Sequence, residues 1–439
     1  MLLRVRRRKP SISNITKMGS KKEKQLPEDV LFSDIFTKLS AKSVLALKPV
    51  KKSWYSSIKN PEFVDRFLAN SFNRPDGTSL LLTTHDQASG QQYFISSTTD
   101  ERLDSRPVCL LSVLETGAEL SVSQNVNGMF LVHTRPHETF YRDRVDDVYV
   151  FNPSTREYLS LPPLPNRASK TWPGSNMNMI SYFFGFDVGS KDYKVVGVCC
   201  DVGAPGLRVE GEVELGIFGL AGGLKAWRVV NVDVPVSFNP CTPGICVNGA
   251  IHWLVKDKRV ILAFDLGLER FRVIKLGDGI GIDTLLGDAD GDGYGNDGEE
   301  EEEDDDDRED EFEEETSVWP CLIQVGSYLA VLEYDDVELR MWVLKDYQNE
   351  QWVMESMDYP YDWNLMHALP CGSSHTSEFF LCLNHNTGSS IPKIVCCDME
   401  RSTYRRINFV EQFEKIDSST VSVSLVGCYP ENIMPLPKI

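Results

Sequence analysis

The sequence lacks any apolar run long enough to cross a membrane. In its 439 residues, no uninterrupted apolar stretch reaches the roughly 18 residues that a transmembrane helix needs. Residues 1–9 are rich in arginine and do not contain the apolar segment of a signal peptide. The 11 cysteines are an odd number without a secretion signal, which favours reduced thiols. We therefore expect a protein of the nucleus, the cytoplasm or both, with no membrane partner.

The sequence also lacks the motifs of catalysis and of cofactor binding. It contains no G-x-S-x-G elbow, no phosphate-binding loop, no G-x-G-x-x-G before a helix and no C-x-x-C pair. No two of its seven histidines have metal-ligand spacing beside a carboxylate on one element. We therefore expect a non-catalytic protein with no catalytic residues, no resident metal and no cofactor.

The net charge of −20 is concentrated in one segment. Residues 288–315 contain 19 acidic residues and one arginine, whereas residues 1–24 contain nine Lys or Arg and one acid. The rest of the chain holds no basic domain of the kind that binds nucleic acid, so we expect no such partner. Residues 1–24 are predicted to be a disordered basic tail, and residues 277–317 a disordered acidic loop.

One match to a calcium-binding loop lies inside the acidic segment. The ligand positions of the EF-hand pattern are occupied by Asp288, Asp290, Asp292 and Glu299. Gly295 stands where the pattern has an aliphatic residue, and a run of acids follows instead of an amphipathic helix. We interpret the match as a product of the Asp- and Gly-rich composition and predict no specific metal site.

Residues 26–72 contain residues that commonly begin or end short helices. Three residues suit a first helical turn, where proline loses no hydrogen bond and acids face the positive end of the dipole: Pro27, Glu28 and Asp29. Ser40 is predicted to cap a second helix. Pro49 should end that helix or begin a third, with three apolar residues on one face before Pro61: Val50, Trp54 and Ile58. Three short helices form a small core, so their excess apolar surface should dock on another body.

These residues resemble an F-box, in particular the form found in plant proteins. The matching stretches are LPEDV at 26–30, IFTKLSAKSV at 35–44, VKKSW at 50–54 and PEF at 61–63. Pro49, and Lys51 where the family often has cysteine, depart from the pattern. The resemblance implies that residues 25–72 bind a Skp-type adaptor and, through it, a cullin-RING ligase. Nine residues are expected at the adaptor interface or in the core behind it: Leu26, Pro27, Val30, Ile35, Phe36, Leu39, Val44, Val50 and Trp54.

Two blocks, residues 79–275 and 318–427, contain many short strands separated by Gly, Pro and Asn. A recurring unit has an Asn-Gly turn or apolar strand, then an apolar strand ending in Asn or Asp, then an aromatic residue before a polar strand. The strand that ends in Asn or Asp is clearest in four segments: 148–152, 182–187, 261–265 and 394–398. Its period of about 45–60 residues predicts an all-β propeller of about six blades.

The same segments resemble the F-box-associated domain of plant F-box proteins, which is similar to a kelch propeller. The resemblance runs from about Ser79 to Leu425. We expect a multidomain protein in which a small all-α F-box is followed by a kelch-like β-propeller. The propeller should span 79–427, interrupted by the acidic loop, and residues 428–439 should be a C-terminal tail.

Together the two resemblances imply the substrate-recognition subunit of an SCF-type (Skp–cullin–F-box) ubiquitin ligase. The propeller would bind an unknown target protein through loops on one face, and residues 166–181 and 359–363 are the candidate loops. Their exposed aromatic residues are the candidate anchors: Trp172, Tyr359, Tyr361 and Trp363. The alternative is a propeller scaffold or lectin-like binding module with a degenerate F-box and no role in ubiquitin transfer.

Overall fold

The structure is a computed structural model, and it describes the following residues: 26–74, 77–86, 91–98, 109–115, 120–134, 147–165, 178–201, 208–221, 226–281, 320–334, 338–359, 369–373, 378–383, 393–407 and 421–437. The predicted basic tail lies outside these ranges. So does most of the predicted acidic loop, including all four residues of the calcium-loop match.

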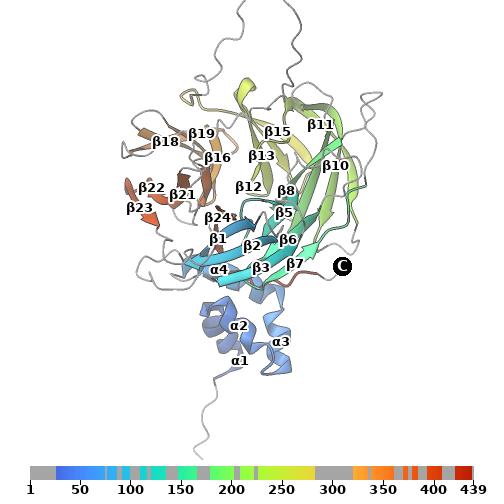
Figure 1. Cartoon of the computed structure of the whole chain (residues 1–439), viewed down its shortest axis with the longest axis vertical. Coiled ribbons are helices and arrows are strands. Elements are labelled where there is room, and N and C mark those ends of the chain that lie inside the picture. The colour runs from blue at the N-terminus through green and yellow to red at the C-terminus, as the bar shows by residue number, and fades with distance from the viewer. Residues whose placement is uncertain are drawn as a thin grey trace, which may run out of the picture.

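Four-stranded antiparallel sheets make up most of the molecule and stand around a common centre as the blades of a propeller (Figure 1). The described residues form six such sheets, as the sequence predicts. The first blade has β1 (Thr78–Asp86), β2 (Gln91–Thr98), β3 (Cys109–Glu115) and β24 (Val421–Pro430), and the second has β4 (Leu120–Val122), β5 (Phe130–Thr134), β6 (Val148–Asn152) and β7 (Glu157–Ser160). The third blade has β8 (Asn178–Asp187), β9 (Asp192–Asp201), β10 (Val209–Gly219) and β11 (Arg228–Phe238), and the fourth has β12 (Ile245–Val247), β13 (Ala250–Val255), β14 (Val260–Asp265) and β15 (Arg270–Lys275). The fifth blade has β16 (Cys321–Val325), β17 (Tyr328–Tyr334), β18 (Glu338–Asp346) and β19 (Gln351–Asp358), and the sixth has β20 (Leu369–Ser373), β21 (Glu378–Leu383), β22 (Lys393–Asp398) and β23 (Thr403–Ile407).

The first blade closes the ring, because it combines strands from both ends of the propeller sequence. β24 pairs with β1 from Thr78 opposite Pro430 to Asp86 opposite Val421. Ring closure of this kind removes exposed sheet edges at the junction. The strand therefore continues past the predicted boundary at residue 427, and the expected tail 428–439 starts inside β24. The physical reason is that its first residues are largely apolar and complete a buried strand.

The predicted strand endings in Asn or Asp are the starts of a repeated tight turn. In each turn, a side-chain oxygen accepts a hydrogen bond from a backbone N–H two or three residues later. The fourth residue after the Asn or Asp has a positive φ between 50° and 60°. The turns begin at Asn152, Asp187, Asp265, Asp346 and Asp398. A short polar side chain thus fixes the direction in which the chain returns.

Two Asn-Gly pairs form hairpin turns of the type I′ class that such pairs favour. The φ angles are 49° and 83° at Asn127–Gly128 and 51° and 82° at Asn248–Gly249. A Cβ atom on Gly128 would lie 2.4 Å from the carbonyl oxygen of Pro430. Glycine is therefore required here both by the backbone angle and by the close approach of another part of the chain.

The strand order gives the propeller two different faces. Because neighbouring strands are antiparallel, the first-to-second and third-to-fourth turns of a blade lie at the same end of its sheet. The Asn/Asp turns and the Asn-Gly turns all lie at that end, which we call the turn face. The second-to-third connections and the connections between blades leave from the opposite end, which we call the link face.

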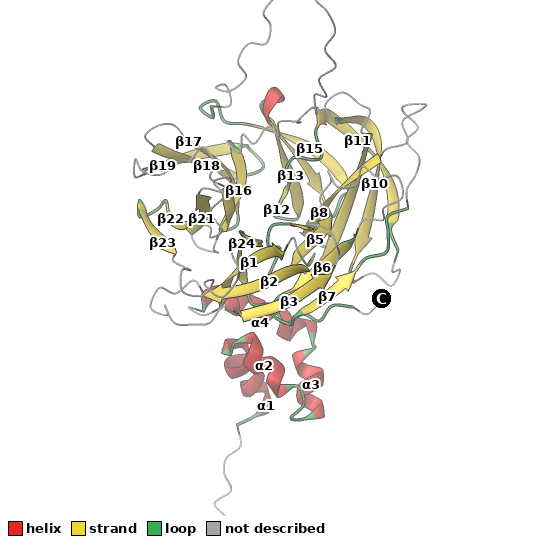
Figure 2. Ribbon diagram, in the orientation of Figure 1, coloured by secondary structure: helices red, strands yellow, loops and turns green. Residues whose placement is uncertain are grey.

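The helices gather at one end of the molecule, below the propeller in Figure 2. They are α1 (Glu28–Val30), which continues as a π-helical turn (Leu31–Ile35) and a 3-10 turn (Phe36–Lys38), and then α2 (Ala41–Leu47), α3 (Lys52–Ile58) and α4 (Pro61–Asn73). A separate 3-10 turn, Lys256–Lys258, lies within the propeller. Ser40 caps α2 as predicted, because its side chain accepts a hydrogen bond from the Ser43 N–H at 3.4 Å.

Two predictions for the helical region differ from the structure. The sequence predicts three short helices that end before Pro61, but Pro61 begins α4, and Asn60 caps it by accepting from the Glu62 N–H at 2.9 Å. Val50 lies in the turn before α3 and is 62% exposed, so it does not share the buried face of Ile58. Proline suits the first position of a helix as well as the residue after one, and in this chain Pro61 takes the first position of α4.

Two predicted loops are also shorter than expected. The acidic interruption begins after residue 281, because Ile280 is buried and the Gly281 N–H donates to Glu333 of β17 at 2.9 Å. Residues 178–181 of the predicted loop 166–181 belong to β8. The two differences have separate causes, because Ile280 and Gly281 contact the fifth blade, whereas residues 178–181 pair with β9 of their own blade.

A buried histidine joins the fourth and fifth blades. His252 on β13 is fully buried, and its Nε2 lies 2.9 Å from the hydroxyl of Tyr347. Arg272 donates a hydrogen bond to the Tyr347 carbonyl oxygen at 3.0 Å and lies over the ring of Tyr347. Burial lowers the pKa of His252 to about 4, so the folded protein resists protonation of this side chain.

We expect His252 to make the fold sensitive to acid. The unfolded chain binds a proton at this residue below its ordinary pKa of 6.5, whereas the folded chain binds it only below about 4. The free energy of unfolding should therefore fall by about 3 kcal/mol between pH 7 and pH 4. Urea unfolding at both pH values should show that His252→Gln lacks this loss, whereas Tyr347→Phe retains it. Equal pH dependence in the wild type and His252→Gln would contradict the assignment.

Candidate functional site

The helical region has a small core made largely of aromatic side chains. Phe36 and Val44 are buried, with 5% and 0% of their surface exposed. Trp54 packs edge-on against Phe36, with ring centroids 5.0 Å apart, and Leu39 covers the same cluster. These four of the nine predicted interface residues therefore build or support the core, and they are not free to form an interface by themselves.

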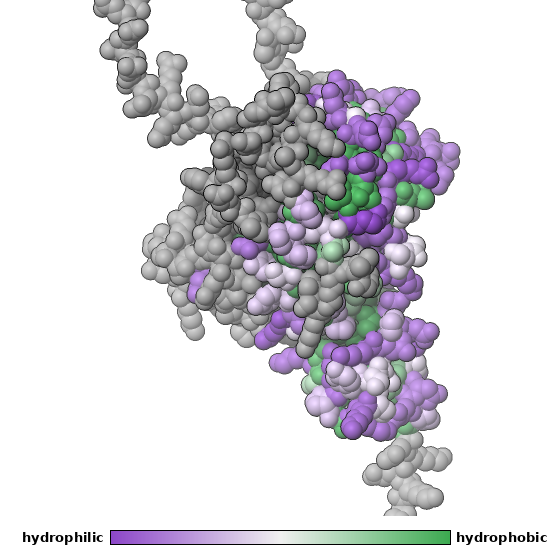
Figure 3. Space-filling view, turned by 90° about the vertical axis from the view of Figure 1, so that its right-hand side faces the viewer, coloured by the Kyte–Doolittle hydropathy of each residue, from purple (hydrophilic) through white to green (hydrophobic). Residues whose placement is uncertain are grey.

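The other five predicted residues lie at the surface. Leu26 and Val50 are 56% and 62% exposed, Ile35 is 36% exposed, Pro27 is exposed and Val30 is half-buried. Figure 3 shows this narrow region at the lower end of the molecule, where apolar green patches interrupt a mostly polar surface. Apolar side chains left uncovered on so small a body are typical of a surface that docks on a partner.

One exposed aromatic residue beside this surface was not predicted. Tyr55 on α3 is 47% exposed, and the Lys59 ammonium group lies 4.3 Å from the centre of its ring. The sequence indicates this exposure indirectly, because Tyr55 directly follows Trp54 on a helix. A helix residue next to one that faces the core points in a different direction. Tyrosine beside a cation is a common anchor at protein interfaces.

Lys51, which departs from the F-box pattern, takes part in an ion pair. Its ammonium group contacts the carboxylate of Glu28, and the pair joins α1 to the start of α3. The hydrogen bond from Lys51 lowers the pKa of the Glu28 carboxyl below its ordinary value. Pro49, the second departure, is exposed in the turn between α2 and α3 and interrupts neither helix.

The segment after β24 binds the helical region. We call residues 431–436 the C-terminal clasp. The Glu431 carboxylate accepts a hydrogen bond from the Ala41 N–H at the start of α2, at 2.9 Å, and forms an ion pair with Arg74 after α4. Ile433 is 1% exposed and belongs to the same apolar cluster as Phe36 and Val44. The helical core is therefore completed by a residue from the far end of the chain.

The same clasp holds the turn face of the propeller. Asn432 is 1% exposed, and its amide donates to the Asn127 carbonyl oxygen at 2.7 Å and to the Tyr193 hydroxyl at 3.1 Å. The Asn152 amide donates to the Met434 carbonyl oxygen at 2.9 Å. The clasp thus links the helical region to the second and third blades.

The sequence did not predict this role for residues 431–436. The sequence predicts a tail at 428–439, and the signal against a tail is the apolar content of Ile433, Met434 and Leu436. An exposed ion pair adds a further contact, since Lys191 of the third blade lies 2.7 Å from Asp65 of α4. Because both side chains are well exposed, we expect this pair to contribute little compared with the buried clasp.

Only one of the four predicted target-binding aromatics lies in the described chain. Tyr359 follows β19 and is half-buried against the apolar cluster shared by the fifth and sixth blades. Trp172, Tyr361 and Trp363 lie outside the described residues. The described strand ends that flank them, Ser160, Asp358 and Leu369, belong to the link face.

Within the described ranges, no group of three or more His, Cys, Asp and Glu side chains is arranged to hold a metal ion. The longest helix described, α4, has 13 residues, and none of the described helices combines the length and apolar character needed to span a bilayer.

Comparison with known proteins gives one family match and several relatives. Residues 79–286 and 313–426 match the F-box associated beta propeller domain family. F-box protein At5g49610 of Arabidopsis thaliana is 25% identical over 339 residues, which cover 76% of this chain and 79% of that protein. F-box protein At3g57590 from the same plant is 25% identical over 334 residues, covering 75% and 70%. F-box protein At1g30790 is 27% identical over 259 residues, covering 55% of this chain and 60% of that protein.

We expect the clasp to control the stability of the helical region. Ile433→Ala would leave a cavity in its core, and buried Ile-to-Ala changes cost about 2–5 kcal/mol. Amide hydrogen exchange in α2 and α4 should therefore become faster, while strands such as β9 and β14 keep their protection. Val353→Ala, which truncates a 45% exposed side chain on β19, is the control. Unchanged exchange in α2 and α4 of Ile433→Ala would refute this role.

Proposed function

The chain belongs to the F-box-associated β-propeller family, and from that premise we propose that it is the substrate-recognition subunit of an SCF-type ubiquitin ligase. The helical region would be the F-box that binds a Skp-type adaptor and, through it, a cullin-RING ligase. The propeller would bind the protein to be ubiquitinated. The observation that carries the proposal is the uncovered apolar surface of Leu26, Ile35 and Val50 on a helical region with a closed core.

In this proposal the chain contributes position and no chemical group. A ligase subunit of this kind raises the effective concentration of target lysines near the ubiquitin-carrying enzyme, which can accelerate a reaction greatly without any catalytic residue. Such positioning works best when the adaptor-binding and target-binding parts keep a fixed distance. The buried contacts of Asn432 and Ile433 supply that rigidity, since they hold the helical region against the turn face.

We propose that the target binds at the link face, with the connections of 166–177 and 360–368 as contact sites. In the described chain the helical region and the clasp contact the turn face, and loops on a rigid scaffold commonly carry recognition. Trp172, Tyr361 and Trp363 are the proposed anchors, with Tyr359 at their base. We place this work in the nucleus or the cytoplasm, where cullin-based ligases act.

We expect capture of a Skp-type adaptor to depend on the exposed apolar surface of the helical region. Val50→Asp, and separately Leu26→Ala combined with Pro27→Ala, should reduce co-purification of the adaptor about tenfold or more, because each removes or charges an interface side chain. Val188→Asp is a matched control, since Val188 on the turn face is also 62% exposed.

The melting temperatures of these variants should stay close to that of the wild type, because the altered side chains are exposed. If the intact chain captures no adaptor at all, the ligase proposal fails and a propeller scaffold becomes the better description. If Val188→Asp loses the adaptor as strongly as Val50→Asp, the placement of the interface is wrong.

We expect target capture to depend on the link-face aromatics. Trp172→Ala and Trp363→Ala should each lower the amount of target protein that accumulates on the chain in proteasome-inhibited plant cells, measured by quantitative mass spectrometry. Adaptor capture should be unchanged. Tyr158→Ala is the control, because Tyr158 is a 53% exposed aromatic residue that lies next to the Asn152 turn. Equal loss of the same proteins in Tyr158→Ala would argue against the link face.

A further inference from the structure

The helical region contains a run of lysines without any acid. Residues 36–60 include six lysines and neither aspartate nor glutamate: Lys38, Lys42, Lys48, Lys51, Lys52 and Lys59. Five of these side chains are exposed, and that of Lys48 is half-buried. Positive charge is therefore concentrated on a small body within a protein whose net charge is −20.

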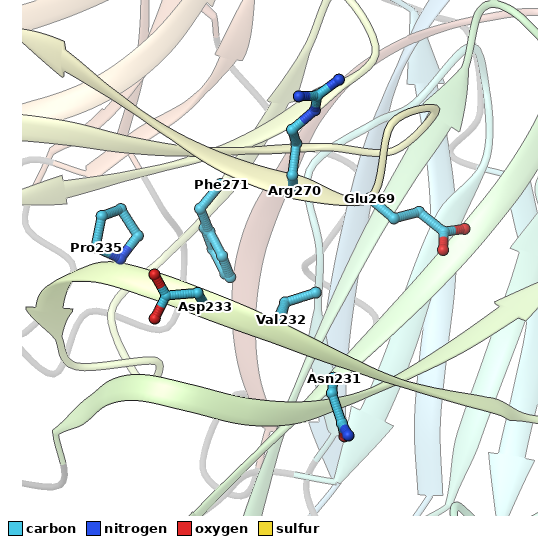
Figure 4. A pocket seen from close by; sticks show the side chains of 7 residues that line it. All are labelled: Asn231, Val232, Asp233, Pro235, Glu269, Arg270 and Phe271. Carbon is cyan, nitrogen blue, oxygen red and sulfur yellow. The ribbon is translucent and has the colours of Figure 1, made fainter.

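A charged groove on the propeller gives a comparison. The groove is lined by residues of β11 and β15, at the rim of the third and fourth blades (Figure 4). Its lining has charges of both signs, namely Asp233, Glu269 and Arg270. Glu269 is also bound by the guanidinium of Arg228, with one of the two contacts at 2.9 Å. Because opposite charges lie together there, the groove favours neither an acidic nor a basic ligand.

Most of the lysines in the helical region have no such partner. Lys51 pairs with Glu28, and Lys48 lies close enough to Glu157 of β7 to interact with its charge. Among the described residues, no carboxylate forms an ion pair with the other four lysines: Lys38, Lys42, Lys52 and Lys59. The positive charge of this region is therefore not neutralised within the described chain.

Some of these lysines stand where they weaken the helical region. Lys42 is the second residue of α2 and Lys52 the first residue of α3, and neither helix has an acid in its first turn. A cation near the positive end of the helix dipole is unfavourable. Burial and the nearby charge of Lys59 lower the pKa of Lys48, although Glu157 acts in the opposite direction. Folding of the helical region therefore does not explain why lysines occupy these positions.

One side of α3 brings two of the lysines together with an aromatic residue. Lys52, Tyr55 and Lys59 are exposed and stand three and four residues apart, a spacing that places them on one side of a helix. We call these three residues the α3 face. The 62% exposed Val50 stands two residues before Lys52, and Cα atoms two residues apart are separated by at most about 7 Å. The α3 face therefore adjoins the exposed apolar surface of the helical region.

This arrangement has the anatomy of a protein interface. Such interfaces commonly have an apolar centre and a rim of polar or charged side chains. Val50 and Tyr55 supply apolar area, and Lys52 and Lys59 stand at either end of the α3 face. Because charges on matching surfaces are complementary, a protein that fits this surface has Asp or Glu side chains opposite the lysines.

The chain's own acidic segment is attached at the other side of the propeller. The described residues that flank it belong to the connection from β15 to β16, which leaves from the link face. The helical region is held against the turn face by Ile433 and Asn432, and it lies at the opposite end of the molecule in Figure 1. A separate acidic protein therefore suits the α3 face better than residues 288–315 do.

We propose that the α3 face binds an acidic surface of the partner that docks on the helical region. Carboxylates of the partner pair with Lys52 and Lys59, and an apolar side chain packs on Tyr55. The inference rests on the proposed function, in which this partner is the Skp-type adaptor, and it adds the chemistry of the adaptor surface. Because charges at the rim of an interface act chiefly on the rate of encounter, this pairing speeds association.

The association of the purified full-length chain with a Skp-type adaptor, followed by biolayer interferometry, tests the proposal. Lys52→Glu combined with Lys59→Glu should lower the association rate constant about tenfold or more at about 0.05 M NaCl. Lys52→Arg combined with Lys59→Arg keeps the charges and should keep the rate. Raising NaCl to about 0.5 M should slow the wild type and reduce its difference from the Glu variant, because salt screens exposed charges.

A matched control comes from the fourth blade. Lys258 and Lys275 are exposed at the link-face end of this blade, and Lys258→Glu combined with Lys275→Glu changes the net charge by the same amount. This control should associate as fast as the wild type. The melting temperature of the α3-face Glu variant should stay close to that of the wild type, since both altered side chains are exposed. If it falls, Lys52→Gln combined with Lys59→Gln removes the charges without adding acids and should still slow association.

Several results would overturn the inference. Adaptor binding that depends neither on salt nor on the α3-face substitutions would overturn it and leave the ligase proposal standing. Equal slowing in the fourth-blade control would also overturn it, because net charge and not the α3 face would then set the rate. Faster association after deletion of residues 288–315, with no such gain in the Glu variant, would make the acidic segment the occupant. If no variant and no wild-type chain captures an adaptor, the ligase proposal itself fails and this inference fails with it.

Discussion

The buried position of the C-terminal clasp is the constraint on which the two parts of this molecule depend. Pro430 ends the strand that closes the propeller, and three residues later Ile433 fills the core of the helical region. Asn432 between them is nearly inaccessible to water and satisfies its amide on Asn127 and Tyr193. A buried polar group with all its partners in place specifies one geometry, because any displacement leaves it unsatisfied. The closure of the propeller ring and the packing of the helical core therefore depend on the same short segment.

The faces of the propeller follow from the same arrangement. The turn face is shaped by short Asn/Asp turns that repeat in most blades, and it carries the clasp and the helical region. The link face carries the connections that vary in length from blade to blade. Connections of unequal length on one face give that face a shape that the repeated turns of the other face do not determine.

Much of the propeller could be predicted from the sequence, because its signals are local. Asn127–Gly128 favours one type of hairpin turn, and Asp265 at the end of a strand predicts the turn that follows it. The helical region was harder. Pro61 is compatible with either end of a helix, and the exposure of Val50 depends on where α3 begins. The neighbouring residues alone therefore do not determine the start of α4 or the exposure of Val50. The clasp could not be predicted in this way, since Ile433 is buried by side chains almost 400 residues away in the sequence. The groove likewise depends on how two blades approach each other, which no pattern within β11 or β15 reveals.

The clasp also sets an order of events during synthesis. The ribosome makes the helical region first and residues 431–434 hundreds of residues later. The helices therefore leave the ribosome before Ile433 exists, and all six blades are synthesised in between. Until then their core lacks one buried side chain, and a chain cut short inside the propeller never acquires it. A complete helical core is thus a property of chains whose ring has closed, and in an unfinished chain the helices lack the side chain that completes their packing.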